Sequence, residues 1–184
     1  MKVLILTSSP NHDGLTAACG DFAKAGVVDA GAEADIININ DLSIGNCHAC
    51  NNGWGTCLLE HECQVKDDFQ NLHQSLNNYD AFVFITPVYW GDMSESAKAF
   101  YDRLRRCEAT QKNKNFVEGK PVICIAAAGG TGNGTMSTLS SMERLISHIR
   151  AVRFDLISIT RKSRDFKLET IGQSSKKMIY QISN

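Results

Sequence analysis

Short apolar segments alternate with longer segments of helical pattern along most of this 184-residue chain. One of the short apolar segments, residues 81–85, is apolar throughout, as expected of a strand in a parallel sheet with both faces covered. The predicted strands are Lys2–Thr7, Ala34–Ile39, Ala81–Ile85, Pro121–Ala126 and Val152–Ile159. Strands that alternate with helices form a parallel sheet with right-handed crossovers and helices on both faces. The alternation therefore predicts an α/β fold around a five-stranded parallel sheet.

Helices are predicted between these strands, and one segment departs from the pattern. The predicted helices are Gly14–Ala30, Asp68–Asn78, Ser94–Arg106 and Thr135–Arg150, with a further one at about residues 167–182, where the periodicity is poor. Residues 41–67 are instead rich in Cys, Gly and Asn and show little periodicity. A chain of this length with 43% apolar residues suits one domain. We expect a single domain over residues 1–184, with a cysteine-rich insertion at about 41–67.

In such sheets ligands bind beyond the carboxyl ends of the strands, where the strand order reverses. For the order 2-1-3-4-5 this point lies between the first and third strands, so the loops after the first, third and fourth strands would meet there. The first loop, Thr7–Thr16, is rich in hydroxyl groups and leads into a helix. The unpaired N–H groups and the dipole of a helix N-terminus favour a phosphate. An ordinary turn capped by Ser or Asp is the other interpretation.

The other two loops also have unusual compositions. Tyr89 and Trp90 follow the third strand and could wall a planar ring, with N–H groups beyond Pro87 bonding to its heteroatoms; alternatively, at least one of the two aromatics folds into the core. The third loop has four glycines within residues 129–134. Glycine lets the backbone approach a ligand closely, although a flexible connection without function would share this composition.

Three motifs, taken in order, carry a resemblance to a known family: Ser8-Ser9-Pro10 with Gly14-Leu15-Thr16, then Thr86–Gly91, then Gly129–Gly134. Together they resemble the flavodoxin-like NAD(P)H-dependent FMN reductases, in the branch that includes the iron–sulfur flavoproteins. The resemblance runs from residue 2 to about residue 150. It implies a flavodoxin-like three-layer α/β/α sandwich with strand order 2-1-3-4-5.

In that family the first loop holds the FMN phosphate and the other two flank the isoalloxazine ring. Carried over by position, the cofactor-binding residues are Ser9, Asn11, His12, Gly14, Leu15, Thr16, Pro87, Val88, Tyr89, Trp90, Gly91, Gly129, Gly130, Thr131, Gly132, Asn133 and Gly134. The family usually has Gly where this chain has Ser8, and a basic residue where it has Asn11. His12 is a candidate to replace that basic residue.

Four of the seven cysteines lie in the insertion: Cys47, Cys50, Cys57 and Cys63. In a chain without an export signal, clustered cysteines indicate metal binding or redox groups before disulfides. The insertion follows the second strand, which places it close to the expected FMN edge of the sheet. The iron–sulfur flavoproteins carry two Cys-x-x-Cys steps here and a fourth Cys shortly before an Asp-Asp pair. By this resemblance Gly53 occupies the third ligand's position, and Cys57 is a displaced candidate.

Three interpretations of the insertion stay open. The four thiolates could hold a [4Fe–4S] cluster. They could instead hold zinc, as could three of them with His48 or His61. In the third interpretation the loop binds no metal, and it lines the flavin or a subunit interface with Trp54.

The net charge of −1 hides an asymmetry between the two halves of the chain. Residues 1–100 carry four Lys/Arg and thirteen Asp/Glu, whereas residues 101–184 carry fifteen and seven. The basic half could attract anionic substrates such as nicotinamide phosphates, although Arg103, Arg105 and Arg106 are consistent with a solvated helix face. Few aromatics interleave with these residues, which argues against nucleic acid as a partner. The chain shows neither a membrane-spanning run nor a signal peptide, so we expect a cytoplasmic protein without a membrane partner.

These patterns and the resemblance predict an FMN-dependent oxidoreductase. It would transfer hydride from NAD(P)H to FMN and then pass electrons to a quinone, a flavin or another small-molecule acceptor. Because the flavin carries the chemistry, no catalytic acid or base is assigned. The alternatives are an FMN electron-transfer protein, which would usually be more acidic than this chain, and a non-catalytic zinc-stabilised binding domain. The resemblance also implies a homodimer or homotetramer.

Overall fold

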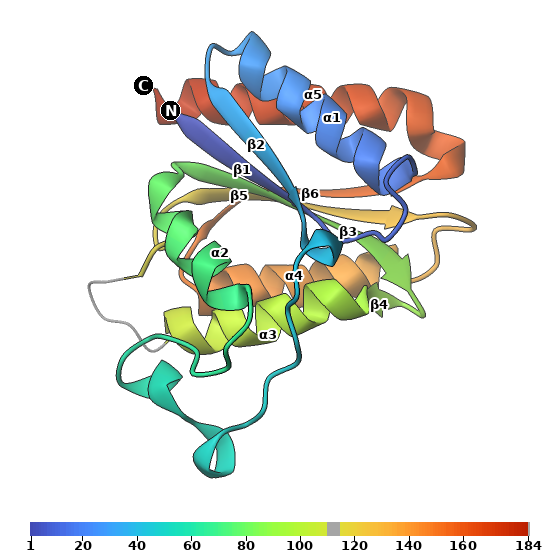
Figure 1. Ribbon diagram of the computed structural model, residues 1–184. Helices are drawn as coiled ribbons and strands as arrows, with labels where there is room; N and C mark the ends of the chain where they lie inside the picture. The colour runs from blue at the N-terminus through green and yellow to red at the C-terminus, as the bar shows by residue number, and fades with distance from the viewer. Residues whose placement is uncertain (110–114, 184) are drawn as a thin grey trace.

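The computed structural model describes residues 1–109 and 115–183, and it consists of a parallel sheet between two layers of helices (Figure 1). The parallel strands lie in the order β2-β1-β3-β5-β6. Their bounds are β1 Lys2–Thr7, β2 Glu33–Asn38, β3 Ala81–Tyr89, β5 Pro121–Ala128 and β6 Val152–Thr160. The predicted flavodoxin-like α/β/α sandwich is confirmed, and so is the predicted order of its five parallel strands.

Helices α1 (Leu15–Asp29) and α5 (Arg164–Ile182) cover one face of the sheet. Helices α2 (Phe69–Ser75), α3 (Glu95–Ala109) and α4 (Thr135–His148) cover the other (Figure 1). Helix α5 begins at Arg164, three residues before the predicted start, and it packs along α1. None of the helices within the described ranges has the length and apolar character needed to cross a membrane.

The structure has a sixth strand that was not predicted, β4 (Asp92–Met93), which pairs antiparallel with the end of β3. The third strand runs to Tyr89 and not to Ile85 as predicted, and Trp90 and Gly91 form a two-residue hairpin turn with φ of +51° and +83°. Pro87 had indicated a turn. Strand β1 ends opposite Ile85, so one side of β3 has no partner strand beyond that residue. Pro87, which lacks an N–H group, therefore interrupts no hydrogen bonds between strands on that side.

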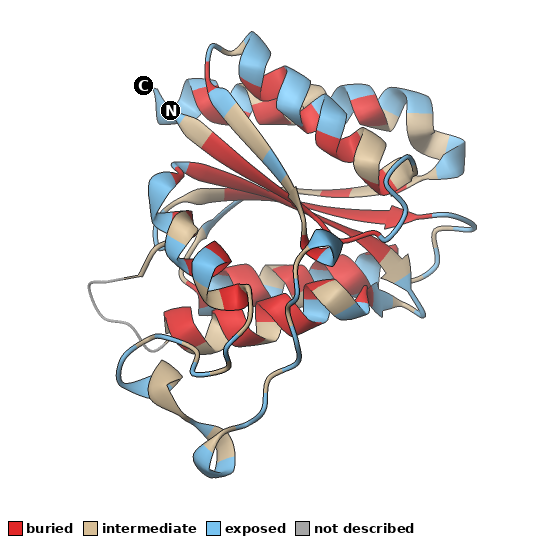
Figure 2. Cartoon of the chain, in the orientation of Figure 1, coloured by how far each residue is buried: buried red, intermediate tan, exposed pale blue. Residues whose placement is uncertain are grey.

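The three central strands are buried on both faces (Figure 2). Successive side chains of a strand point to opposite faces, so each strand contributes to two cores. On one side Leu4 and Phe82 pack with residues of α2, α3 and α4. On the other side Val3 and Val83 pack with residues of α1 and α5. These rigid central strands position the loops at their carboxyl ends.

The cysteine-rich insertion contains only short 3₁₀ turns, at Asn51–Gly53 and Thr56–Leu58. It leaves the end of β2, extends past α3 on the outer side of the helix layer, and returns to α2 (Figure 1). Its residues are exposed or half-buried, unlike those of the central strands (Figure 2). The insertion is therefore an appendage to the sandwich and does not interrupt the sheet.

Candidate functional site

The loop after β1 is held in place by hydrogen bonds from neighbouring elements. Ser8 is fully buried, and its hydroxyl donates to the Ile85 carbonyl at 3.3 Å. The Asn38 amide donates to the Ser9 carbonyl at 2.9 Å, and the Ser9 hydroxyl accepts from the Asn11 N–H group at 3.2 Å. A hydroxyl at position 8, where the resembled family usually has glycine, thus adds a link between this loop and β3.

A polar pocket opens where this loop meets the N-terminus of α1. Its lining includes four side chains with hydrogen-bonding groups from the predicted set: Ser9, Asn11, His12 and Thr16. Helix α1 begins after Gly14 without a side-chain cap, so its first N–H groups are not claimed by a side-chain acceptor. Such donors beside hydroxyl groups fit the phosphate of FMN.

Residues that were not predicted also line this pocket, among them Asn38, Asp41 and, from α1, Asp21. Asn38 comes from the end of β2, and Asp41 lies just beyond it, with its carboxylate 3.5 Å from His12 Nε2. Asn38 and Asp41 thus lie at the end of the second strand and just after it, in a segment that carries none of the three motifs. Asn38, a polar residue at the carboxyl end of the neighbouring strand, is the sequence feature that could have indicated this part of the pocket.

The second predicted loop is the β3–β4 hairpin, and both of its aromatic side chains face outward. Tyr89 is 47% exposed and Trp90 is fully exposed. The alternative in which one of them folds into the core is wrong, because the hairpin extends beyond the end of β1 and leaves no core to enter. Pro87 and Val88 are, in contrast, buried or half-buried.

The third loop, residues 129–134, packs directly against this hairpin. A Cβ atom at Gly134 would lie 2.4 Å from the Gly91 Cα atom, so the two backbones touch. The Ser137 hydroxyl donates to the Gly91 carbonyl at 2.5 Å. Arg161, which follows β6, lies beside Gly129 and was not predicted; its guanidinium is 3.9 Å from where a Cβ atom of that glycine would be.

Ser94 connects the first loop to the second. Its hydroxyl donates to the Ser8 carbonyl at 2.9 Å, and its N–H group donates to the Thr86 hydroxyl at 3.0 Å. Ser94 is buried and was predicted only as the start of a helix. The three predicted loops therefore lie together at the carboxyl edge of the sheet, with Ser94 and Gly134 at the two contacts between them.

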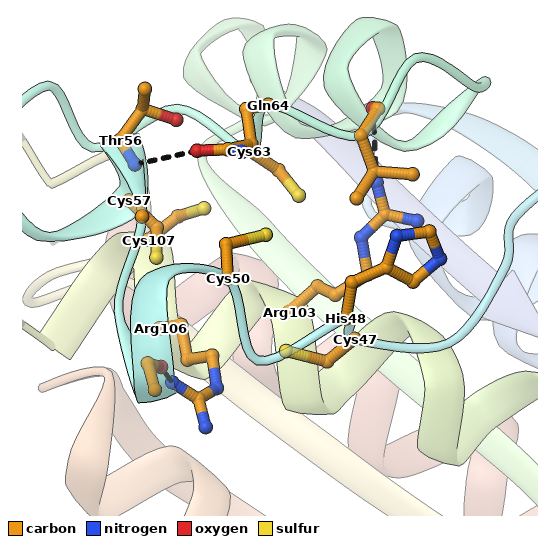
Figure 3. Close-up of a pocket in the computed structure, with 13 residues that line it drawn as sticks. Cys47, His48, Cys50, Thr56, Cys57, Cys63, Gln64, Arg103, Arg106 and Cys107 are labelled. Atoms are coloured by element: carbon orange, nitrogen blue, oxygen red, sulfur yellow. Dashed lines mark hydrogen bonds between the residues drawn. The ribbon is translucent and has the colours of Figure 1, made fainter.

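A second pocket, the cysteine pocket, lies between the insertion and α3 (Figure 3). All four predicted cysteines line it, and α3 adds a fifth that was not predicted. Its lining includes Cys47, Cys50, Cys57, Cys63, Cys107, Arg103 and Arg106. Burial raises the pKa of the Cys107 thiol well above its ordinary value, and the nearby Cys63 and Cys57 raise it further.

Arg103 closes the insertion onto the sandwich. Its side chain is 1% exposed and bonds to both carboxylate oxygens of Asp67, at 2.5 and 2.8 Å. It also donates to the Gly45 carbonyl at 2.9 Å, so it binds both ends of the insertion. The expected solvated helix face is wrong at this residue, because the insertion folds over α3. The Arg103 Nε atom is buried and has no hydrogen-bond partner among the described residues.

Asp67 of the insertion and Arg106 of α3 also hold the insertion in place on the sandwich. Burial alone would raise the pKa of Asp67, but hydrogen bonds from Arg103 and from the Gly45 and Phe69 N–H groups lower it below its ordinary value. Arg106 donates to the Gly53 carbonyl and lies over the Trp54 ring, 4.8 Å from its centroid. Charged groups of α3 thus hold the insertion at its base and at its tip.

The cysteine pocket lies away from the loops described above. Helix α3 begins beside β4, at the carboxyl edge, whereas Arg103 and Cys107 lie eight and twelve residues into it. At the rise of an α-helix this is roughly 12–18 Å along the axis. The expected position close to the FMN edge is wrong for Cys50, Cys57 and Cys63, because the insertion follows α3 away from that edge. Cys47 does lie toward that edge, since it lines a hollow with Met93 of β4 and Glu95 at the start of α3.

The arrangement of the five sulfurs bears on what the pocket could hold. Over residues 1–109 and 115–183, no three His, Cys, Asp or Glu side chains are placed to hold a metal ion. A cubane cluster makes a different demand, because each thiolate binds a different iron and the sulfurs need not converge on one point. Five cysteines around one pocket, with an unpartnered Arg103 N–H group beside them, fit such a cluster better than zinc.

The sequence was compared with known proteins. It matches the NADPH-dependent FMN reductase family over residues 1–158. An iron–sulfur flavoprotein of Methanocaldococcus jannaschii is 28% identical over 130 residues, which are 71% of this chain and 65% of that protein. An NAD(P)H quinone oxidoreductase of Candida albicans is 28% identical over 80% of this chain and 67% of its own length. The chain spans about half to two thirds of the length of the iron–sulfur flavoproteins it matches.

Solved structures agree with the fold. The NAD(P)H:quinone oxidoreductase of Methanothermobacter marburgensis superposes with a TM-score of 0.72 at 16% identity, over 97% of this chain and 96% of that one. An archaeal flavodoxin superposes over both complete chains with a TM-score of 0.67. At such identities the likeness concerns the arrangement of strands and helices.

Proposed function

The chain belongs to the NADPH-dependent FMN reductase family, and we propose that it binds FMN and oxidises NAD(P)H, passing the electrons to a small-molecule acceptor. The acceptor class that we propose is a quinone or a free flavin, because a quinone oxidoreductase is among its relatives. The proposal is carried by one observation: the phosphate-type pocket of the first loop, the aromatic hairpin and the glycine loop meet at one edge of the sheet.

Each of the three loops would have a separate role in holding the cofactor. The N-terminus of α1, with Ser9 and Thr16, would bind the phosphate through neutral donors. Backbone N–H groups of residues 89–91 and 129–134 would lie beside the ring and stabilise negative charge on it. When bound, FMN supplies the acceptor for hydride from the nicotinamide.

The outward-facing aromatics and the basic residue at the edge fit the incoming substrate. Tyr89 and Trp90 stand clear of the core and would cover the ring or the nicotinamide, excluding water from their contact. Arg161 lies beside Gly129 at the same edge, where it would attract the phosphates of a nicotinamide dinucleotide. These roles require position and charge, and none requires a side-chain acid or base.

An absorption spectrum taken without oxygen tests the proposal. The full chain, purified or supplied with FMN, is expected to show flavin bands that bleach when NADH or NADPH is added and return when a quinone follows. Comparison of the two nicotinamides at equal concentration identifies the preferred donor. A protein that takes up no FMN contradicts the proposal.

The named relatives favour one alternative, an FMN electron-transfer protein that never meets nicotinamide. The flavin absorption bands of such an electron-transfer protein would bleach with dithionite but not with NADH or NADPH. The zinc-stabilised binding domain has less support, given the lack of a three-ligand group among the described residues. The homodimer or homotetramer stays a prediction, and sedimentation of the FMN-loaded chain tests it.

A further inference from the structure

We propose that the cysteine pocket binds a [4Fe–4S] cluster through Cys50, Cys57, Cys63 and Cys107. In this assignment α3 supplies the ligand that the insertion lacks at Gly53. The set differs from the four insertion cysteines predicted from the sequence, because Cys107 replaces Cys47. It does not depend on flavin binding, since the pocket and the three loops are separate.

The structure explains why a ligand at position 53 is missing. The backbone of Gly53 has a φ of +135°, a conformation that L side chains rarely adopt, and its carbonyl accepts a hydrogen bond from Arg106. A cysteine at this position would be strained. The loop is thus built around a glycine, and the fourth thiolate must come from elsewhere.

Cys107 is placed to be that thiolate. It lies on the rigid helix beneath the loop, is fully buried and lines the same pocket as the insertion cysteines. In Figure 3 the side chains of Cys50, Cys57, Cys63 and Cys107 gather in one part of the pocket. As each thiol binds iron it releases its proton to solvent, and no cysteine is oxidised in the process.

Cys47 is the less suitable fifth cysteine. Its sulfur lies apart from the other four, below the Arg103 side chain in the view of Figure 3. It also borders a separate, more open hollow that is lined by Glu95 and Asp102. Asp102 is paired with Lys98 there, so Glu95 is the carboxylate that would repel a cluster whose four thiolates leave it with a net charge of about −2.

Two arginines fit such an anionic group. Arg103 and Arg106 both line the pocket. The buried Arg103 Nε–H group, which has no partner in the described part of the chain, would donate to a cluster or cysteine sulfur. Hydrogen bonds of this kind adjust the reduction potential of iron–sulfur clusters.

The test loads the full chain with equal amounts of ferrous and ferric iron and with sulfide, without oxygen, because a cluster of this net charge holds two irons at each oxidation level. We expect about four irons and four acid-labile sulfides per chain. Cys107→Ser should lose at least half of both, together with the paramagnetic resonance signal of the dithionite-reduced protein. Cys47→Ser should keep them, and so should Cys19→Ser, a control at a buried cysteine on the opposite face of the sheet.

Three outcomes overturn the assignment: full iron in Cys107→Ser, loss of iron in Cys47→Ser, or one tightly bound zinc and no cluster in the wild-type chain. If Cys107→Ser fails to fold, alkylation of the cysteines in the loaded wild-type chain still tests the proposal. In the loaded wild-type chain, Cys47 should still react with iodoacetamide, and its protection would also overturn the proposal. Iron content is measured independently of flavin bleaching, so failure here is distinguishable from failure of the proposed reductase.

Discussion

At the scale of single residues, Arg103 is the side chain whose loss should cost the most. Among the described residues it is the largest fully buried side chain, and it binds Asp67 and the Gly45 carbonyl together. Arg103→Met should lower the free energy of unfolding by about 3 kcal/mol, because it leaves the Asp67 carboxylate without its cation. Denaturant titration measures the change. The neighbouring, half-buried Arg105 provides the control, and Arg105→Met should cost less than about 1 kcal/mol.

The same pair should make the protein sensitive to acid. Because the pKa of Asp67 is lowered in the folded chain, this group stabilises the fold above its unfolded pKa of about 4. That contribution is lost as the pH falls through the lower, folded value. Asp67→Asn should therefore be less stable than wild type at pH 7, and the difference should shrink toward pH 2. A difference in unfolding free energy that is constant with pH would contradict this assignment.

At the scale of elements, the contact between the glycine loop and the hairpin should control flavin affinity. Gly134 has a φ of +85°, and a Cβ atom there would meet the Gly91 backbone at 2.4 Å. Gly134→Ala should weaken FMN binding at least tenfold, or about 1.4 kcal/mol, in a fluorescence titration of the apoprotein. Gly119 has a φ of +74° but open space around it. Gly119→Ala thus separates backbone strain from loop displacement and should leave FMN affinity unchanged.

The crossing of α1 and α5 depends on another glycine. A Cβ atom at Gly26 would lie 2.0 Å from the Gly172 carbonyl oxygen, so the two helices touch backbone to backbone. Alanine is ordinarily about 1 kcal/mol better than glycine in a helix. Gly26→Ala should nevertheless destabilise the protein by about 2 kcal/mol, because the helices must separate. In Gly20→Ala the shortest contact of the new methyl is with a Thr7 methyl, at 3.3 Å, and the Ile36 atoms lie at ordinary contact distance, so the thermal midpoint should change little.

At the scale of the whole molecule, stability should be unevenly distributed. The central strands are buried on both faces, whereas the insertion is exposed or half-buried and contains only short turns. In native-state hydrogen exchange, amides of Val3–Leu6 and Phe82–Ile85 should open only with global unfolding, and those of residues 46–62 much sooner. Uniform protection across both regions would contradict this picture.

The sequence predicts those parts of the molecule that depend on local pattern. Apolar runs such as Ala81–Ile85 identify the strands, and the strand order brings the three loops to one edge. Features that depend on distant partners were not predicted. Arg103 pairs with Asp67 across 36 positions, and Cys107 joins the insertion cysteines only because the loop folds back over α3. Strand β4 was missed because Pro87 and Gly91 both resemble turn residues when read without their neighbours.

The fully exposed Trp90 at the tip of the hairpin has a spectroscopic consequence. The chain contains two tryptophans, and the other, Trp54, lies under Arg106 at the cysteine pocket. Each candidate site therefore carries its own intrinsic fluorophore. Emission from a Trp54→Phe chain would originate at the flavin edge alone, and emission from a Trp90→Phe chain at the pocket alone. Occupancy of the two sites could then be followed separately in the same protein, without any attached dye.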